Sequence, residues 1–366
     1  MEQPGYNIIK QQDIDYGKGE TLSPAGSRNT VFKALWTSPL RSTEVAVKSC
    51  NQFKEEEVKI LAALQHKNII KFHGVVKLDF PPDAYVIVTE YAEKGSLYKI
   101  IDQNRDNWSV YRRRVWMKWA REGAEGLDYI HQKGYQHGDV KSPNFVITGD
   151  NAMKICDFGT ARQHVYTVST YSVRGSWPWM APEAMGVPGK SVNPKVTTKA
   201  DVFSFAVVLW ELFTGQIPFP GLSQLEIYKT VAEKKKRLDI PEEFPIFLGD
   251  LLRECWNPDY KHRPSMKEVL AVLFGLHAAS LSDMDRCLNS VARKLRSEEW
   301  FALGTLMGFA AADFDACKTA HPHSLRLQIT SMLIGWRNQQ YDDKGTILHH
   351  LGAILASDAV GRPDLR

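Results

Sequence analysis

The sequence predicts an α+β fold followed by a compact all-α domain, and three observations support this prediction. Residues from about 8 to 80 alternate apolar and polar side chains between turn signals, which is typical of half-buried strands. From Leu97 onward the apolar spacing is mostly helical. After residue 284 a new series of short helical patterns begins. A β-rich segment followed by helices indicates a small sheet lobe and a larger helical lobe.

Composition places the chain among globular proteins. Of its 366 residues, 43% are hydrophobic and 24% are charged, and the net charge is +4. This charge is too small to favour nucleic acid as a partner, and we interpret the basic run at residues 234–237 as a solvated helix end. The longest apolar run, residues 203–210, is much shorter than the ~20 residues that span a bilayer. We therefore expect neither nucleic acid binding nor membrane insertion.

The five cysteines are odd in number and far apart, and none forms a CxxC pair. This pattern excludes a zinc cluster or a disulfide framework and favours a reducing cytosol, so we expect a cytoplasmic location. Residues 1–5 lack the basic-then-apolar pattern of a signal peptide. We interpret Cys156 as a small buried hydrophobic residue, with redox sensing as the alternative.

Individual elements can be placed in the first domain. Residues 45–48 and 85–89 have the pattern of strands, and residues 54–64 have the pattern of a helix. Five residues spaced three or four apart form an apolar stripe that we expect in the core: Trp116, Trp119, Gly123, Leu127 and Ile130.

The most informative stretch is His-Gly-Asp-Val-Lys-Ser-Pro-Asn at residues 137–144, followed by Asp-Phe-Gly at 157–159. The spacing fits the catalytic loop and the metal-holding aspartate of a protein kinase. In that pattern Asp139 orients and deprotonates the substrate hydroxyl, and Lys141 neutralises the transferring phosphate. Asn144 and Asp157 hold Mg²⁺.

Further parts of the pattern occur in the expected order. Lys48, at the end of a strand pattern, is expected to hold the α- and β-phosphates of ATP. Glu57 is the best candidate to orient Lys48, although Glu55 and Glu56 lie beside it. Asp201 is expected to brace the catalytic loop.

Ala-Pro-Glu at residues 181–183 closes the activation segment, and Arg263 is a plausible buried partner for Glu183. Any one of these residues alone has an ordinary structural explanation, such as a turn or a solvated strand edge. Their joint occurrence in order indicates a kinase fold.

The glycine-rich loop departs from the pattern. Residues 24–31 align with a GxGxxGxV loop, but only Gly26 and Val31 remain. Pro24 removes one backbone N–H group, and Asn29 replaces the third glycine. Glycine matters here because the backbone must approach phosphates closely. We expect the loop to fold, with reduced ATP affinity or loop mobility.

Residues from about 14 to 273 resemble a protein kinase catalytic domain. Within that family they are most similar to the mixed-lineage kinases, especially the branch that otherwise carries a leucine zipper and a sterile-alpha-motif domain. The resemblance is carried by residues 88–92, 154–159, 179–183 and 207–212.

This resemblance implies ATP and Mg²⁺ as cofactors and serine/threonine specificity, supported by Lys141 and Ser176. It also implies a downstream kinase of a stress-activated cascade as the protein substrate. It assigns Thr89 as gatekeeper and the hinge that faces adenine to Glu90 through Ala92. The implied apolar sandwich around the purine consists of Val31, Ala46 and Val146.

Gly138 replaces the arginine found at this place in most kinases. That arginine pairs with a phosphate on the activation segment and orders it, whereas glycine offers no cation. The segment still holds four hydroxyls: Thr167, Ser169, Thr170 and Ser172. We predict that phosphorylation there is not the dominant switch, which favours activation by proximity.

Residues from about 284 to 366 resemble a death domain, with matches at 291–295, 300–308 and 336–337. The resemblance implies a six-helix bundle that associates with death domains of other proteins and with itself. We expect Trp300 and Trp336 in its core. Two charged groups provide opposed faces for association: Arg293, Lys294 and Arg296, and Asp313, Asp315, Asp342 and Asp343. A generic helical bundle with a solvated surface is the alternative.

The complete prediction is a two-lobed protein kinase domain over residues 10–275 and an all-α death domain over residues 284–366. The expected function is an ATP-dependent serine/threonine kinase of the mixed-lineage type, clustered through its death domain in intracellular stress, innate-immune or apoptotic signalling. The alternative is a kinase-shaped scaffold with little catalysis that signals by assembly.

Overall fold

The computed structural model describes most of the chain, and the chain divides into two compact units, residues 1–224 and 225–366. The described residues are 5–17, 20–22, 30–38, 41–50, 55–78, 84–163, 176–186, 197–241, 244, 246–278, 291, 295–320, 325, 328–329, 332–333, 335–336, 351 and 353–355.

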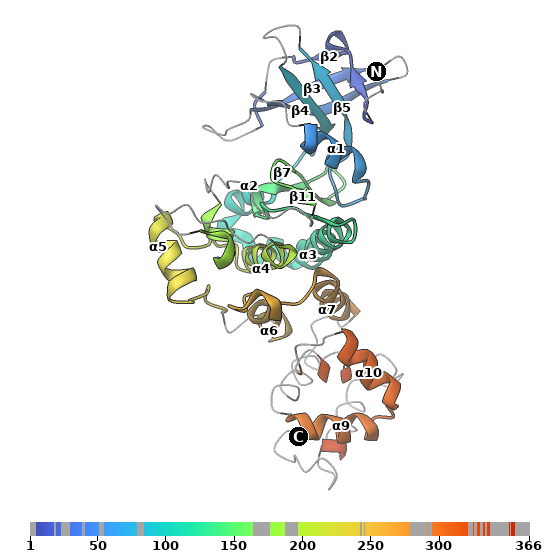
Figure 1. The fold of residues 1–366 in the computed structure, drawn as a ribbon, viewed down its shortest axis with the longest axis vertical. Helices are drawn as coiled ribbons and strands as arrows, with labels where there is room; N and C mark the ends of the chain where they lie inside the picture. Colours follow the sequence, from blue (N-terminus) through green and yellow to red (C-terminus); the bar gives the residue numbers. More distant parts are fainter. Residues whose placement is uncertain are drawn as a thin grey trace. The chain divides into compact units, whose positions relative to one another are not determined.

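The first unit opens with a six-stranded sheet in the order β1-β5-β6-β4-β3-β2 (Figure 1). Neighbouring strands of this sheet are antiparallel, except that β1 and β5 are parallel. The strands are β1 (Ile8–Ile9), β2 (Ile14–Asp15), β3 (Val31–Thr37), β4 (Ser42–Cys50), β5 (Phe72–Lys77) and β6 (Tyr85–Glu90). Alternate residues such as Val45 and Val47 are buried in one core, as a half-buried strand requires. The strands predicted at 45–48 and 85–89 are confirmed.

Helix α1 (Glu55–Ala63) lies between β4 and β5 in the chain and confirms the helix predicted there. Its first turn holds three glutamates, whose charge favours the amino end of a helix dipole. Only Glu57 of the three is buried, together with Val58, Ile60 and Leu61. The buried face of α1 therefore selects one carboxylate.

The rest of the first unit is mainly helical: α2 (Leu97–Gln103), α3 (Trp108–Gln132) and α4 (Thr198–Thr214). Four members of the predicted stripe on α3 are buried, which confirms their place in the core: Trp116, Trp119, Leu127 and Ile130. Helix α4 is apolar around its circumference and is almost entirely buried. The side chain of Thr197 caps its amino end, and left-handed Gly215 follows its carboxyl end.

Short strands frame the loops that carry the kinase motifs. β7 (Gly95–Ser96), β9 (Phe145–Ile147) and β10 (Met153–Ile155) form one small sheet, and β8 (Tyr135–Gln136) pairs with β11 (Arg162–Gln163). Because residues 137–144 connect β8 to β9, and residues 156–161 connect β10 to β11, the two motif loops start from paired strands.

The second unit is helical: α5 (Gln224–Tyr228), a π-helical turn (Lys229–Glu233), α6 (Ile246–Cys255), α7 (Met266–Ala278), α9 (Ser297–Leu306) and α10 (Ala311–Ala320). Helix α5 begins one residue before the division between the units. Helix α7 continues past residue 275, where the predicted kinase domain ends.

The buried apolar side chains described between residues 291 and 355 form one core, and α9 and α10 lie in the region where short helical patterns are predicted after residue 284. Trp300 and Trp336 are both buried in it, as predicted. Arg293, Lys294, Asp342 and Asp343 lie outside the described residues. Within the described part of the chain, no helix has the length and apolarity needed to cross a membrane.

Candidate active site

Lys48 joins two segments of the predicted site. Its ammonium group on β4 lies 2.7 Å from Glu57 Oε1 on α1 and 2.9 Å from Asp157 Oδ1. The Glu57 side chain is only 6% exposed, whereas Glu55 and Glu56 face solvent. The structure thus brings Lys48, Glu57 and Asp157 together and selects the glutamate that the sequence favoured.

The charges of this cluster stabilise one another. Burial would raise the pKa of Asp157, but the charge and hydrogen bond of Lys48 lower it to about 2. Burial opposes the charge on Lys48 as well, but the carboxylates of Asp157 and Glu57 raise its pKa above the usual range. Both groups therefore remain charged throughout the neutral pH range.

Asp139 lies in a short network with three other side chains. Its carboxylate is 2.6 Å from Lys141 Nζ and accepts hydrogen bonds from Ser176 Oγ at 2.6 Å and Asn144 Nδ2 at 3.1 Å. Lys141 also donates to Ser176 Oγ at 2.9 Å. The hydroxyl of Ser176 therefore contacts both the predicted base and the predicted phosphate-binding lysine. Sequence reasoning had used Ser176 only as a sign of specificity.

Asp201 holds the start of the catalytic loop from α4. Its two carboxylate oxygens accept the backbone N–H groups of His137 and Gly138, each at 2.8 Å. His131 Nε2 lies 2.9 Å from the same carboxylate. Although burial opposes the charge, the hydrogen bond with His131 lowers the pKa of Asp201. The predicted bracing role of Asp201 is confirmed.

A second buried carboxyl group, Glu211 on α4, was not singled out from the sequence. It accepts hydrogen bonds from Ser142 Oγ at 2.7 Å and from Trp179 Nε1 at 2.6 Å. Burial raises the pKa of Glu211 to about 8. Glu211 therefore connects the catalytic loop to the segment that follows Ser176. Sequence spacing does not indicate a contact between Glu211 and Ser142, because the two residues are 69 positions apart.

The predicted adenine-facing residues lie on neighbouring strands. Thr89 on β6 pairs with Ala46 on β4, and Val31 on β3 pairs with Lys48. Glu90 is tied by its carboxylate to Lys154 Nζ at 2.8 Å and to a backbone N–H at 3.1 Å.

Two more predicted residues are described, and one is not. Ala92 follows β6 and accepts a backbone hydrogen bond from Gly95 at 3.1 Å, while Val146 lies on β9. Gly26 falls outside the described residues. The contacts of this set with a purine stay predictions.

The backbone N–H group of Cys156 donates a hydrogen bond of 2.9 Å to the carbonyl oxygen of Asn144. This bond holds the backbone just before Asp157 beside Asn144, the other predicted metal ligand. Asp157 itself has φ of 62°, a left-handed conformation in which aspartate is enriched. A carboxylate and an amide oxygen fit Mg²⁺, which is commonly bound by one or two side chains with phosphate oxygens and water. No cluster of three or more His, Cys, Asp or Glu side chains suited to a metal occurs among the described residues.

Cys156 lies immediately before this aspartate. Burial raises the pKa of its thiol to about 12. The raised pKa keeps the thiol protonated at neutral pH, which argues against redox sensing, although Cys156 is partly buried and not fully buried as predicted.

Residues 20–273 match the family model for protein tyrosine and serine/threonine kinases. Among curated proteins, the mitogen-activated protein kinase kinase kinase dlk-1 of Caenorhabditis briggsae is 37% identical over 246 residues, which cover 67% of this chain and 27% of that protein. Mitogen-activated protein kinase kinase kinase 12 of Rattus norvegicus is 35% identical over 237 residues, covering 65% and 25%. Mitogen-activated protein kinase kinase kinase zak-1 of Caenorhabditis elegans is 32% identical over 287 residues, covering 76% and 37%.

The matched part of the chain thus spans 25–37% of the length of these relatives. The matched region contains Lys48, Glu57, the catalytic loop and Asp157. The fold agrees with the match, because a sheet-rich part precedes a helical part and the motif side chains of the two parts meet at Lys48. The chain belongs to the protein tyrosine and serine/threonine kinase family.

Proposed function

We propose that the protein is an active serine/threonine kinase that transfers the γ-phosphoryl group of ATP to protein hydroxyls. The observation that carries this proposal is the double contact of Lys48 with Glu57 and Asp157. A lysine oriented in this way can bind phosphates, and a paired Asp157 stays ionised and can bind metal. A scaffold that had lost catalysis would not need Lys48 held between the buried Glu57 and the accessible carboxylate of Asp157.

Each protein group has a defined task in the transfer. Asp139 accepts the proton as the substrate oxygen attacks the γ-phosphorus, while the bond from that phosphorus to the bridging oxygen breaks and ADP leaves. Lys141 lies close enough to Asp139 to stabilise the charge on the transferring group. Mg²⁺, held by Asn144 and Asp157, neutralises charge on the phosphates when bound.

The nucleotide would enter with its adenine against the hinge. We propose that Glu90 to Ala92 face the adenine edge, that Thr89 limits the depth of the site and that Gly26 approaches the phosphates. The purine is enclosed by three apolar residues: Val31, Ala46 and Val146. Their places on β3, β4, β6 and β9 support this arrangement.

Serine/threonine specificity is supported by Ser176. Its hydroxyl donates to Asp139 and accepts from Lys141, so the loop is shaped around a short aliphatic hydroxyl. The names of the relatives support protein substrates that are themselves kinases, and the resemblance supports a mixed-lineage type within a stress-signalling cascade.

We further propose that residues 284–366 form a death domain that recruits and clusters the kinase in the cytoplasm through homotypic contacts. The apolar core shared by Val291, α9, α10 and Trp336 supports a separate helical bundle. Clustering suits a catalytic loop with glycine at 138, because proximity can replace a phosphate-dependent switch.

The decisive experiment is phosphorylation of the protein itself and of a generic protein substrate with Mg²⁺ and ATP. Asp139→Asn and Lys48→Met should reduce the rate by a factor of about 10²–10⁴, because each removes a group that acts in the transition state. Glu57→Gln should also reduce it, whereas Glu56→Gln, an exposed neighbour, should leave it unchanged. No signal above that of Asp139→Asn would favour the scaffold.

Clustering has its own test. Charge reversal at Arg293 and Lys294 should reduce the size of oligomers measured by light scattering, because like charges would then meet across the interface. Lys267→Glu, an exposed residue on α7 outside both charged groups, is the control. Unchanged oligomer size after reversal at residues 293 and 294 would contradict the proposed contact.

A further inference from the structure

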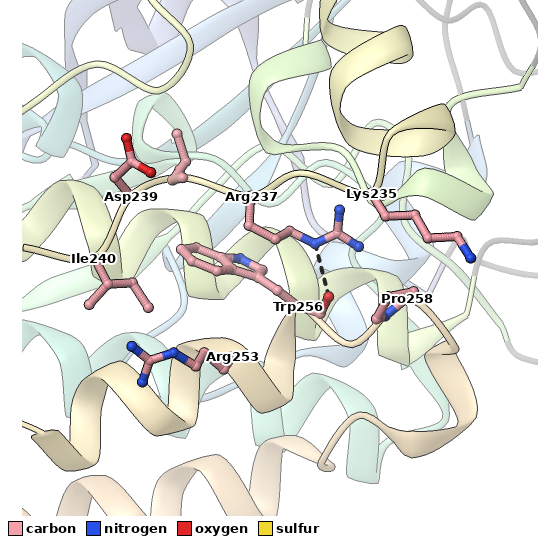
Figure 2. Close-up of a pocket in the computed structure, with 8 residues that line it drawn as sticks. Lys235, Arg237, Asp239, Ile240, Arg253, Trp256 and Pro258 are labelled. Atoms are coloured by element: carbon pink, nitrogen blue, oxygen red, sulfur yellow. Dashed lines mark hydrogen bonds between the residues drawn. The ribbon is translucent and has the colours of Figure 1, made fainter.

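A basic pocket lies in the second unit. Its lining comes from two segments, residues 235–240 after the π-helical turn and residues 253–258 at the carboxyl end of α6. Its volume is about 340 Å³. The pocket is lined by Lys235, Arg237, Leu238, Asp239, Ile240, Arg253, Trp256 and Pro258 (Figure 2). Three of these eight residues are cations and one is an anion, so the lining carries a net positive charge.

The backbone beside the pocket has two uncommon features. The chain passes through a π-helical turn at Lys229–Glu233, and Lys235 then adopts a left-handed conformation with φ of 54°. π-helical turns occur often at functional sites, and a non-glycine residue at positive φ is strained. These features set the course of the chain at Lys235, whose side chain is exposed at the pocket.

Arg237 differs from the three lysines before it. The lysines are exposed, as the predicted solvated helix end requires, but Arg237 is partly buried. It donates through Nε to Trp256 O, and through Nη1 to Val231 O and Lys236 O, each at 2.9 Å. The prediction of a solvated run is therefore wrong for its last residue, which fixes the pocket wall to the end of α6.

Trp256 supplies an apolar wall with a polar atom. The residue is only 3% exposed, and its indole N–H has no hydrogen-bond acceptor among the described residues. Figure 2 shows the indole between the Arg237 segment and the helix that carries Arg253.

Charge is distributed unevenly around this wall. Arg253 on α6 is half-exposed and pairs with Asp250 at 2.8 Å. In Figure 2 Asp239 lies at one end of the pocket and Lys235 at the other. A ligand with its anionic group toward Lys235 would face two cations, Lys235 and Arg237, and keep its distance from the one carboxylate.

We propose that this pocket docks an acidic segment of a partner protein, with an apolar side chain beside the partly exposed Leu238 and Ile240 and an adjacent anionic group toward Lys235. The volume is at the lower end for small-molecule sites, which suits one or two side chains better than a cofactor. The net positive lining attracts anions and disfavours basic segments. The site takes no part in phosphoryl transfer, so the proposal does not depend on catalytic activity.

The test is a fluorescence anisotropy titration of the full chain with a fluorescein-labelled peptide of alternating aspartate and leucine. A peptide with asparagine in place of aspartate keeps the apolar side chains and removes the charge. A third peptide, with phosphoserine in place of aspartate, distinguishes a phosphoryl group from a carboxylate as the anion. We expect at least one anionic peptide to bind about tenfold more tightly than the asparagine peptide.

Lys235→Glu should weaken this binding about fivefold or more, whereas Lys234→Glu should weaken it less than about twofold. The two variants change the net charge equally, but only Lys235 lines the pocket. Both residues are exposed, so both variants should fold, as thermal melting will verify. Equal weakening by the two variants, or equal binding of all three peptides, would overturn the proposal.

Discussion

The indole N–H of Trp179 donates a hydrogen bond of 2.6 Å to the buried carboxyl group of Glu211. The other oxygen of the same group accepts from Ser142, two residues before the predicted metal ligand Asn144. Glu211 therefore holds the catalytic loop and the segment after Ser176 to one helix, α4. Glu211 is buried, and neither of these two donors is a cation that would stabilise its charged form. The protonation of its carboxyl group should therefore affect the stability of the folded protein.

Glu211 should make the folded protein less stable as the pH rises. Burial raises the pKa of Glu211 to about 8 from a usual value of 4.5. Between these values the folded state retains a proton that the unfolded chain has released, so the free energy of unfolding falls with rising pH. The slope from this group is at most about 1.4 kcal/mol per pH unit.

Glu211→Gln removes this titration and keeps an oxygen that can accept from Trp179. The difference in unfolding free energy between the variant and the wild type should therefore move in favour of the variant from about pH 4.5 to pH 8. Urea unfolding at a series of pH values measures it. Parallel stability curves for the two proteins would contradict the raised pKa.

Ser176 should contribute to the rate through its contacts with Asp139 and Lys141. Ser176→Ala removes the hydroxyl between them and should lower kcat by roughly tenfold, since hydrogen bonds to charged groups contribute about 1.5–3 kcal/mol. Ser176→Thr keeps the hydroxyl and should retain most of the activity. Steady-state kinetics with ATP and a protein substrate measure both. An unchanged kcat in the alanine variant would remove Ser176 from the catalytic network.

The activation segment should not depend strongly on its own phosphates. Gly138 has φ of 76°, where glycine is unstrained, and it presents no cation to a phosphate. Replacing Thr167, Ser169, Thr170 and Ser172 together by alanine should therefore leave the rate within about threefold of wild type. An inactive alanine variant whose activity is restored by acidic substitutions at the same four positions would contradict this prediction. Phosphates would then control the segment without the arginine that Gly138 replaces.

The arrangement of the proposed catalytic residues could be predicted because their order and spacing are local. Asp139, Lys141 and Asn144 lie within six residues of the loop after β8, and the side chains of Lys141 and Asn144 both contact the Asp139 carboxylate. The sequence does not determine which of the three successive glutamates pairs with Lys48, because all three have similar helix preferences. Only the packing of α1 determines which one is buried and reaches Lys48.

Contacts between distant segments could not be predicted in the same way. Glu211 occurs within an apolar helix, where its neighbours indicate burial but not a partner. Its two donors come from loops whose course depends on the assembled fold. The basic run at 234–237 has the same limit, because only the position of Trp256 explains why Arg237 turns inward.

Gly215 should be essential to the end of α4. Its φ is 71°, and its N–H group donates to Glu211 O at 2.7 Å. A Cβ atom at this position would lie 2.3 Å from Cδ1 of Trp108, whose own indole N–H donates to Leu212 O at 3.0 Å. Gly215→Ala therefore combines backbone strain with a steric clash and should lower the free energy of unfolding by about 3 kcal/mol.

Gly221 provides the matched control for that substitution. It has φ of 77°, but a Cβ atom there would meet nothing within 4 Å. Gly221→Ala should therefore cost only the backbone term, about 1 kcal/mol. Urea unfolding of the two variants separates the clash from the strain, because the strain is common to both. Equal losses of stability would mean that Trp108 moves aside without cost, and that its contact with Gly215 does not hold the end of α4.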